Sequence, residues 1–205
     1  LDVPPPTEPS AEGTQMNRRH TIILTVILST GLLALGAYAR TAIQNKGSDT
    51  LVNVAQAWAE AYAKKAPEVA IAVSGGGSGT GIAAMINGTV DIANSSRQMK
   101  QSEIDLAREH GQEPVEHIVG YSGLAYATDH VNMACIAAED GGSCVSPSVA
   151  TASNRTYPIA RPLFMYTNGE PQGDVKDYLD WILSDAGQCI ILNKGYAPVR
   201  DVTCE

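Results

Sequence analysis

The chain has 205 residues, of which 44% are hydrophobic and 18% are charged, and these proportions exclude a wholly disordered protein. Its formal net charge of −8 argues against a nucleic-acid-binding protein, because contact with a phosphate backbone requires a basic surface. A single anion site remains compatible with this charge, since such a site depends on local donors rather than on the total charge.

The first 39 residues are expected to lie outside the fold. Residues 1–15 are polar and rich in proline, precede the first methionine, and are interpreted as a non-native upstream segment. Residues 16–39 have the pattern of an export signal, because basic residues follow Met16, Thr21–Gly36 is apolar, and Ala37-Tyr38-Ala39 fits a cleavage site. An uncleaved membrane anchor is the alternative, although the apolar run is shorter than the ~20 residues that span a bilayer.

Strand and helix patterns alternate from residue 40 onward. Runs rich in β-branched and small apolar residues predict strands at Thr41–Lys46, Val69–Val73, Val90–Ala93 and Pro114–Val119. Apolar residues at helical spacing predict helices between them, at Leu51–Lys65, Ile82–Asn87 and Ser102–His110. This order predicts an α/β fold with a mostly parallel sheet flanked by helices.

The second half of the chain is less regular. Strands are predicted at Val131–Ala137 and Leu163–Thr167, with a glycine-rich loop at Glu139–Ser146 between them. Helical segments are predicted at Ser148–Ser153, Asp174–Leu183 and Ala186–Asn193. Residues 40–205 are therefore expected to form one domain.

All four cysteines lie in this second half, and an exported chain meets oxidising conditions that favour disulfides. Four cysteines allow three pairings, and the pairs nearest in sequence, Cys135–Cys144 and Cys189–Cys204, are predicted. A zinc site is the weaker alternative, because the chain has no C-x2-C and its histidines lack ligand-like spacing. We expect no metal and no cofactor.

Three polar loops carry the candidate chemistry: Ser48-Asp49-Thr50, Ser78-Gly79-Thr80 and Ser95-Ser96-Arg97. Each follows a predicted strand, so in a parallel sheet all three fall at the edge where ligands bind. Helix N-termini favour anions, and an arginine adds a fork of donors that suits an oxyanion. The alternative is that Ser48 and Asp49 only cap a helix and that Arg97 is a surface charge.

Asp49 would repel a fully ionised anion such as sulfate. Its carboxylate can, however, accept a hydrogen bond from the O–H of a protonated phosphate. The pattern therefore favours phosphate over sulfate.

Other motifs do not support an enzyme. Gly79–Ala84 fits the dinucleotide fingerprint G-x-G-x-x-A, but a single match of this kind is weak, and the Walker A pattern is absent. No serine fits a nucleophile elbow, and no nucleophile has a placed base.

Several stretches resemble the periplasmic phosphate-binding proteins of bacterial ABC phosphate transporters: Gly47–Pro67, Ser74–Met99, Glu113–Tyr121, Gly120–Val131, Arg155–Gln188 and Gly195–Val199. The resemblance implies a type II periplasmic-binding-protein fold, in which two α/β lobes close on one phosphate ion, and a permease partner at the inner membrane. It implies phosphate contacts from the residues Ser48, Thr50, Ser78, Gly79, Ser96 and Arg97, with Asp49 as the acceptor of the phosphate proton.

The chain departs from the family pattern at Gly120-Tyr121, where the end of one family segment coincides with the start of another. We interpret this as an internal deletion that leaves a single lobe, built from residues 40–121 and 131–204 and lacking the second phosphate loop. The expected function is phosphate binding for transport, weakened by the loss of the second lobe. The alternatives are a folded remnant without useful affinity and, less favoured, a phosphate-ester hydrolase.

Overall fold

The computed structural model describes residues 41–122 and 134–204. The upstream segment, the export signal and the first three residues of the predicted strand at Val131–Ala137 lie outside the described residues. Among the residues that are described, no helix has the length and apolar character needed to cross a membrane.

Five strands form one mixed sheet in the order β2-β1-β3-β5-β4. Their bounds are Thr41–Gly47 for β1, Val69–Ser74 for β2, Ile92–Ser95 for β3, Pro114–Ser122 for β4 and Arg161–Asn168 for β5. β1 pairs in parallel with β2 and β3, whereas β5 lies antiparallel between β3 and β4. The first four strands therefore share one direction, as a mostly parallel sheet requires, and only β5 runs against them.

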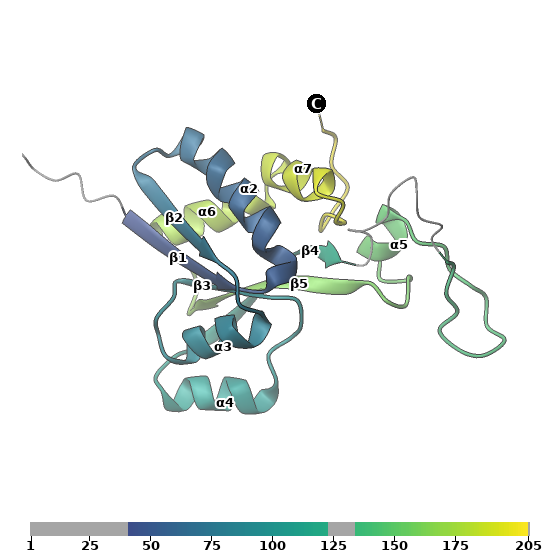
Figure 1. Ribbon diagram of the computed structural model, residues 1–205, viewed down its shortest axis with the longest axis horizontal. Helices are drawn as coiled ribbons and strands as arrows, with labels where there is room; N and C mark the ends of the chain where they lie inside the picture. The colour runs from purple at the N-terminus through teal and green to yellow at the C-terminus, as the bar shows by residue number, and fades with distance from the viewer. Residues whose placement is uncertain (1–40, 123–133, 205) are drawn as a thin grey trace, which may run out of the picture. The chain divides into compact units, whose positions relative to one another are not determined.

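The helices cover both faces of this sheet (Figure 1). One face carries α2 (Asp49–Lys65), α6 (Gly173–Leu183) and α7 (Asp185–Asn193), and the other carries α3 (Ser78–Ile86) and α4 (Gln101–Glu109). The short helix α5 (Val149–Ser153) lies beside β4. Because both faces are covered, Leu163–Thr167 in the inserted strand β5 are buried throughout.

The larger core lies under α2, α6 and α7. The helical spacing of Leu51, Val54, Trp58 and Tyr62 places all four side chains on the buried face of α2. Trp58 is fully buried, and its Nε1 donates a hydrogen bond to the carbonyl oxygen of Gly187 at 2.7 Å. This contact ties α2 to α7 across the core. The smaller core on the opposite face packs Ile82 and Met85 of α3 near the rings of Phe164 and Tyr166.

The segment 134–160 contains little regular structure. The strand predicted at Val131–Ala137 is wrong over its described part, where only Ile136 pairs, in an isolated bridge with Val145. The described residues around it are largely exposed, and none of the described strands extends the bridge into a ladder. Both predicted disulfides, Cys135–Cys144 and Cys189–Cys204, are present.

Candidate functional site

Backbone hydrogen bonds bring the three polar loops together at one edge of the sheet. The Ser48 amide donates to the carbonyl oxygen of Asn94 at 2.9 Å, and the Gly77 amide donates to that of Gly47 at 3.0 Å. The Ser96 amide donates to Ser78 Oγ at 3.0 Å. The ends of β1 and β3 and the start of α3 therefore meet, because parallel strands place their carboxyl ends at the same edge.

The glycine-rich loop before α3 is held by Asp49, whose Oδ1 accepts a hydrogen bond from the Gly76 amide at 2.8 Å. A Cβ at Gly75 would lie 2.5 Å from the same oxygen, so this close approach requires glycine. Gly77 precedes α3 with a φ of 89°, a left-handed conformation that side chains other than glycine disfavour. Asp49 thus shapes the loop with one of its carboxylate oxygens.

The N-terminus of α3 supplies amide donors at this edge. The Thr80 amide donates to the carbonyl oxygen of Gly77 at 3.1 Å and is the first in the helix to bond back to its own turn. The preceding amides, of Ser78 and Gly79, have no backbone acceptor within the described part of the chain. They are the groups that an anion at a helix N-terminus uses.

Two serine hydroxyls lie in contact beside these amides, with Ser78 Oγ and Ser96 Oγ 3.2 Å apart. Ser48 occupies the N-cap position of α2, but its side chain makes no capping hydrogen bond.

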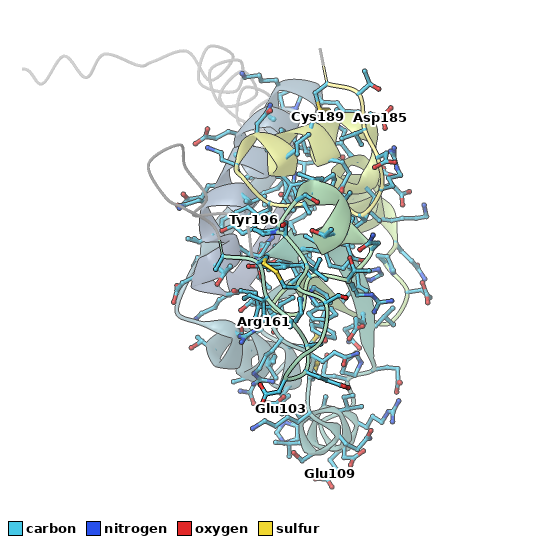
Figure 2. The ribbon with its side chains drawn as sticks, turned by 90° about the vertical axis from the view of Figure 1, so that its right-hand side faces the viewer. Glu103, Glu109, Arg161, Asp185, Cys189 and Tyr196 are labelled. Carbon is cyan, nitrogen blue, oxygen red and sulfur yellow. A yellow bond between two sulfur atoms is a disulfide. The ribbon has the colours of Figure 1, made fainter. Side chains whose placement is uncertain are left out.

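The guanidinium of Arg97 is fixed in place by Glu103. Glu103 lies in the first turn of α4 and is labelled in Figure 2. Its Nη1 and Nη2 donate to the two carboxylate oxygens of Glu103 at 2.8 and 2.7 Å. Nη1 also donates to the carbonyl oxygen of Gln98 at 2.9 Å. Hydrogen bonding to Arg97 lowers the pKa of Glu103, and the same contact raises the pKa of Arg97.

These contacts leave one edge of the Arg97 guanidinium open. Glu103 and Gln98 together use both N–H groups of Nη1 and one of Nη2. The Nε–H and the second N–H of Nη2 have no acceptor among the residues described, and they form a parallel pair suited to two oxygens of an oxyanion. Two residues after β3, the structure therefore holds a fixed guanidinium with two of its five N–H groups without an acceptor among the described residues.

The seven predicted site residues do not line one hollow. Ser96 and Arg97 border a hollow of about 360 Å³. Asp49 and Thr50 border a separate one of about 330 Å³ along α2, and the carbonyl oxygen of Thr50 accepts a hydrogen bond from Tyr196 Oη at 2.7 Å.

Three residues near the site were missed by the sequence analysis: Glu103, Arg155 and Arg161. Glu103 accepts a hydrogen bond from the Lys100 amide at 2.8 Å, and an acidic residue in the first turn of a helix is a signal that the sequence offered. Arg155 and Arg161 border the same hollow as Arg97. These two arginines lie on either side of Pro158, which is in the turn before β5. Their positions in the sequence gave no sign that they share a hollow with Arg97.

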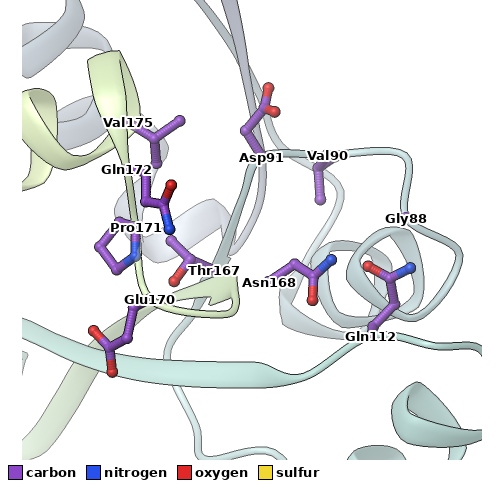
Figure 3. Close-up of a pocket in the computed structure, with 10 residues that line it drawn as sticks. All are labelled: Gly88, Val90, Asp91, Gln112, Thr167, Asn168, Glu170, Pro171, Gln172 and Val175. Carbon is purple, nitrogen blue, oxygen red and sulfur yellow. The ribbon is translucent and has the colours of Figure 1, made fainter.

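A polar hollow of about 410 Å³ lies at the opposite edge of the sheet (Figure 3). Two of its polar side chains hold backbone amides, since Asp91 Oδ2 accepts from the Gln44 amide at 2.7 Å and Asn168 Oδ1 accepts from the Glu113 amide at 2.8 Å. We therefore assign these residues to the packing of strand ends. In the described ranges, no group of three His, Cys, Asp or Glu side chains is arranged to hold a metal ion.

Comparison with known proteins relates this architecture to solute-binding proteins. The Phosphate-binding protein PstS of Pseudomonas aeruginosa is 33% identical over 85 residues, a match that covers 40% of this chain and 26% of that protein. The chain thus matches about a quarter of the length of this relative.

Two solved structures share the fold. A protein from Planctomyces limnophilus described as a possible phosphate binding protein superposes with a TM-score of 0.65 and 18% identity, over 78% of this chain and 93% of its own. An ABC-type phosphate transport receptor from Vibrio cholerae gives a TM-score of 0.59 and 17% identity, over 76% of this chain and 99% of its own. At these identities the superpositions establish the fold, which is the periplasmic-binding-protein fold predicted from the sequence.

The family model described as a PBP superfamily domain matches residues 34–140, which is more than half of the 205-residue chain. This stretch contains β1 to β4 and all three polar loops. The chain therefore belongs to the PBP superfamily.

Proposed function

We propose that this protein binds inorganic phosphate at the edge formed by its three polar loops, as the periplasmic or otherwise exported substrate-binding component of an ABC phosphate transporter. Support comes from its membership of the PBP superfamily and from the phosphate-binding relative that it matches over 85 residues. In this role it binds and delivers an ion to a permease and carries out no chemical reaction.

The open edge of the Arg97 guanidinium is the observation that carries the proposal. Glu103 orients the guanidinium and leaves two parallel N–H groups exposed to an incoming ligand. An oxyanion on that edge is held by a charge-assisted pair of hydrogen bonds. The Ser78 and Gly79 amides and the paired Ser78 and Ser96 hydroxyls supply further donors at the same sheet edge.

Asp49 selects for a protonated anion in this proposal. Although Asp49 borders a different hollow from Arg97, its Oδ2 lies beside Gly77 at the start of α3, 3.9 Å from the position of a Cβ there. Its Oδ1 accepts the Gly76 amide, and Oδ2 has no hydrogen-bond partner among the described residues. The second oxygen accepts the O–H of monohydrogen phosphate. Sulfate has no proton to donate at neutral pH, so its charge is repelled without compensation.

Phosphate affinity is expected to be low because the described residues form one lobe, in line with the internal deletion that we infer at Gly120-Tyr121. A two-lobed binder surrounds its ion with donors from both sides. On an open edge the ion keeps part of its hydration and its charge interactions are screened. A loss of ~4 kcal/mol would weaken the affinity about a thousandfold, from micromolar to roughly millimolar.

Titration calorimetry of the full chain with phosphate and sulfate tests the proposal. We expect phosphate binding with a Kd of roughly 0.1–1 mM, at least tenfold weaker binding after Arg97→Gln, and unchanged binding after Arg108→Gln. Arg108 is the matched control because it also pairs with a glutamate, Glu113, on an exposed surface.

Asp49→Asn adds a test of selectivity. It should narrow the gap between phosphate and sulfate, since an amide can donate to an anion that carries no proton. A cooperatively folded protein that releases no heat up to about 10 mM phosphate would overturn the proposal and leave a folded remnant. Equal phosphate affinity for Arg97→Gln and the wild type would overturn the assignment of the site.

A further inference from the structure

The hollow that borders Ser96 and Arg97 extends beyond the predicted phosphate loops. It has a volume of about 360 Å³ and is also bordered by Arg155, from the turn after α5, and by Arg161, the first residue of β5. In Figure 2, Arg161 is labelled near the middle of the view, between Tyr196 and Glu103. The loop that carries Arg97 and the later segment that carries Arg155 and Arg161 are distant in sequence, and both place arginines at this hollow.

Arg155 and Arg161 differ from the other arginines in how their charge is balanced. Within residues 41–122 and 134–204, Arg97, Arg108 and Arg200 each pair with a carboxylate. Arg155 and Arg161 have no ion pair in the same described ranges. In a chain with a formal net charge of −8, two arginines that border one hollow without an ion pair favour an anion there.

The backbone holds Arg155 in an unusual conformation. Its φ is 60°, and no other non-glycine residue of the described chain has a positive φ. The position follows the end of α5, where glycine or asparagine is the usual occupant. The turn is fixed nearby by Tyr157, which is 5% exposed and whose amide donates to the carbonyl oxygen of Thr151 at 2.9 Å. A non-glycine residue in this conformation is strained, and strained residues are common at binding sites.

The rest of the hollow is mostly apolar, with one acidic group. Ile118, Pro162 and Phe164 line it. Glu116 also borders the hollow, but its Oε2 accepts a hydrogen bond from Tyr166 Oη at 2.7 Å. The hollow is therefore bordered by one carboxylate, which is already hydrogen-bonded, and by two arginines without an ion pair among the described residues.

We propose that this hollow is a second anion subsite, and that the protein accepts an organic phosphate or phosphonate whose short carbon chain ends in a carboxylate. The inference rests on the proposed function, because the phosphoryl group would occupy the Ser96 and Arg97 loops. The carboxylate would pair with Arg155 and Arg161, and the carbon chain would contact Phe164 and Pro162. Inorganic phosphate fills the first subsite only.

Titration calorimetry of the full chain with a matched series of ligands tests the inference. The series is inorganic phosphate, ethylphosphonate, phosphonoacetate, 3-phosphonopropionate and 4-phosphonobutyrate. We expect at least one carboxylated phosphonate to bind tenfold or more tightly than ethylphosphonate. The chain length that binds best would report the separation of the two subsites.

Variants separate the second subsite from the first. Arg155→Gln combined with Arg161→Gln should remove the tenfold advantage of the carboxylate and change the affinity for inorganic phosphate less than twofold. Glu116→Gln should increase the advantage because it removes the opposing charge. Arg108→Gln is the control for the loss of an exposed arginine, and thermal melts verify that each variant is folded.

The outcomes distinguish the two claims. Phosphate binding without any advantage for the carboxylated ligands, or an advantage that persists in the double arginine variant, overturns the second subsite alone. Failure of phosphate and of every phosphonate to bind overturns the proposed function and this inference with it.

Discussion

The two stretches of chain that border the candidate site, residues 41–122 and residues 134–160, are held in place by different interactions. The first contains four strands and three helices whose side chains fill two buried cores. The second contains one helix of five residues, an isolated bridge and a disulfide. Its contributions to the buried interior are confined to side chains such as Ala152 and Tyr157.

This difference bears on how each stretch would serve the site. Ser78, Ser96 and Arg97 project from the ends of packed strands and helices, so burial of the core fixes their positions. Arg155 lies on a turn that depends on a helix cap and on one buried tyrosine. The first subsite should therefore survive perturbations that displace the second.

The largest change in stability is expected from substitutions in the buried core of the first stretch. Trp58→Ala should lower the free energy of unfolding by about 3–5 kcal/mol, because it removes a fully buried indole and leaves the Gly187 carbonyl without its donor. Urea unfolding measures this change. Ile159→Ala, at a side chain that is 49% exposed in the second stretch, is the control and should change the stability by less than ~0.5 kcal/mol. Similar losses of stability in the two variants would contradict the conclusion that the first stretch is held by its buried core and the second is not.

The two disulfides sharpen the comparison because one lies in the second stretch and the other joins α7 to the C-terminal segment. Cys189–Cys204 closes a separation of 15 residues, for which chain entropy predicts about 3 kcal/mol. Its segment is coupled to the fold, since the Ala197 amide donates to the carbonyl oxygen of Tyr121 at 2.9 Å. Among the described residues, the backbone of the loop closed by Cys135–Cys144 forms hydrogen bonds only within residues 135–145, between Ile136 and Val145 and between Gly142 and Glu139.

Replacing both cysteines of each pair with serine separates these roles. The variant lacking Cys189–Cys204 should lose up to ~3 kcal/mol of global stability in urea unfolding. The variant lacking Cys135–Cys144 should lose less than ~1 kcal/mol but be cut faster by protease within residues 134–147. A larger global loss from the second variant would mean that the loop is coupled to the core.

Local patterns predicted most of the fold. Leu51, Val54, Trp58 and Tyr62 recur at helical spacing, and all four side chains are buried. The antiparallel insertion of β5 between β3 and β4 could not be predicted in this way, because its direction depends on the path of the chain from Ser122 to Arg161 rather than on its own residues. A strand pattern gives the length and the burial of a strand but not its neighbours.

The sequence predicted which loops of the candidate site meet, because each of these loops follows the end of a strand. Ser78 and Ser96 were placed at one edge by topology alone, and their hydroxyls are in contact. The pairing of Arg97 with Glu103 and the approach of Arg155 and Arg161 to the same hollow depend on side-chain direction and on the turn at Arg155. These are tertiary properties that leave no periodic signal in the sequence.

The serines at the N-cap positions of α5 and α2 allow a further comparison of the two stretches, with a smaller expected effect on stability. Ser148 Oγ accepts a hydrogen bond from the Thr151 amide at 3.0 Å and caps α5, whereas Ser48 makes no capping bond to α2. Ser148→Ala should cost about 1 kcal/mol, measured by urea unfolding, and should weaken the binding of the carboxylated phosphonates. Ser48→Ala should cost less in stability and weaken phosphate binding instead. Equal stability losses for the two variants would indicate that capping does not hold the second stretch.

The smallest effect is a pH dependence within the first stretch, at His117 on β4. Thr167 Oγ1 donates its hydrogen to the carbonyl oxygen of Gly169 at 2.9 Å, so His117 Nε2, 2.9 Å from the same oxygen, must be the donor in their contact. Burial lowers the pKa of the half-buried His117 below its ordinary value of 6.5, against the opposing charges of Glu170 and Glu116.

Because the folded state binds this proton less readily than the unfolded state, the contribution of neutral His117 to stability is complete above about pH 6.5. It is lost as the pH falls through the lower pKa of the folded protein. Urea midpoints measured between about pH 7.5 and pH 5.5 should therefore fall in the wild type and fall less in His117→Gln, whose side-chain amide can still donate to Thr167. Equal slopes in the two proteins would show that His117 does not couple folding to protons in this range.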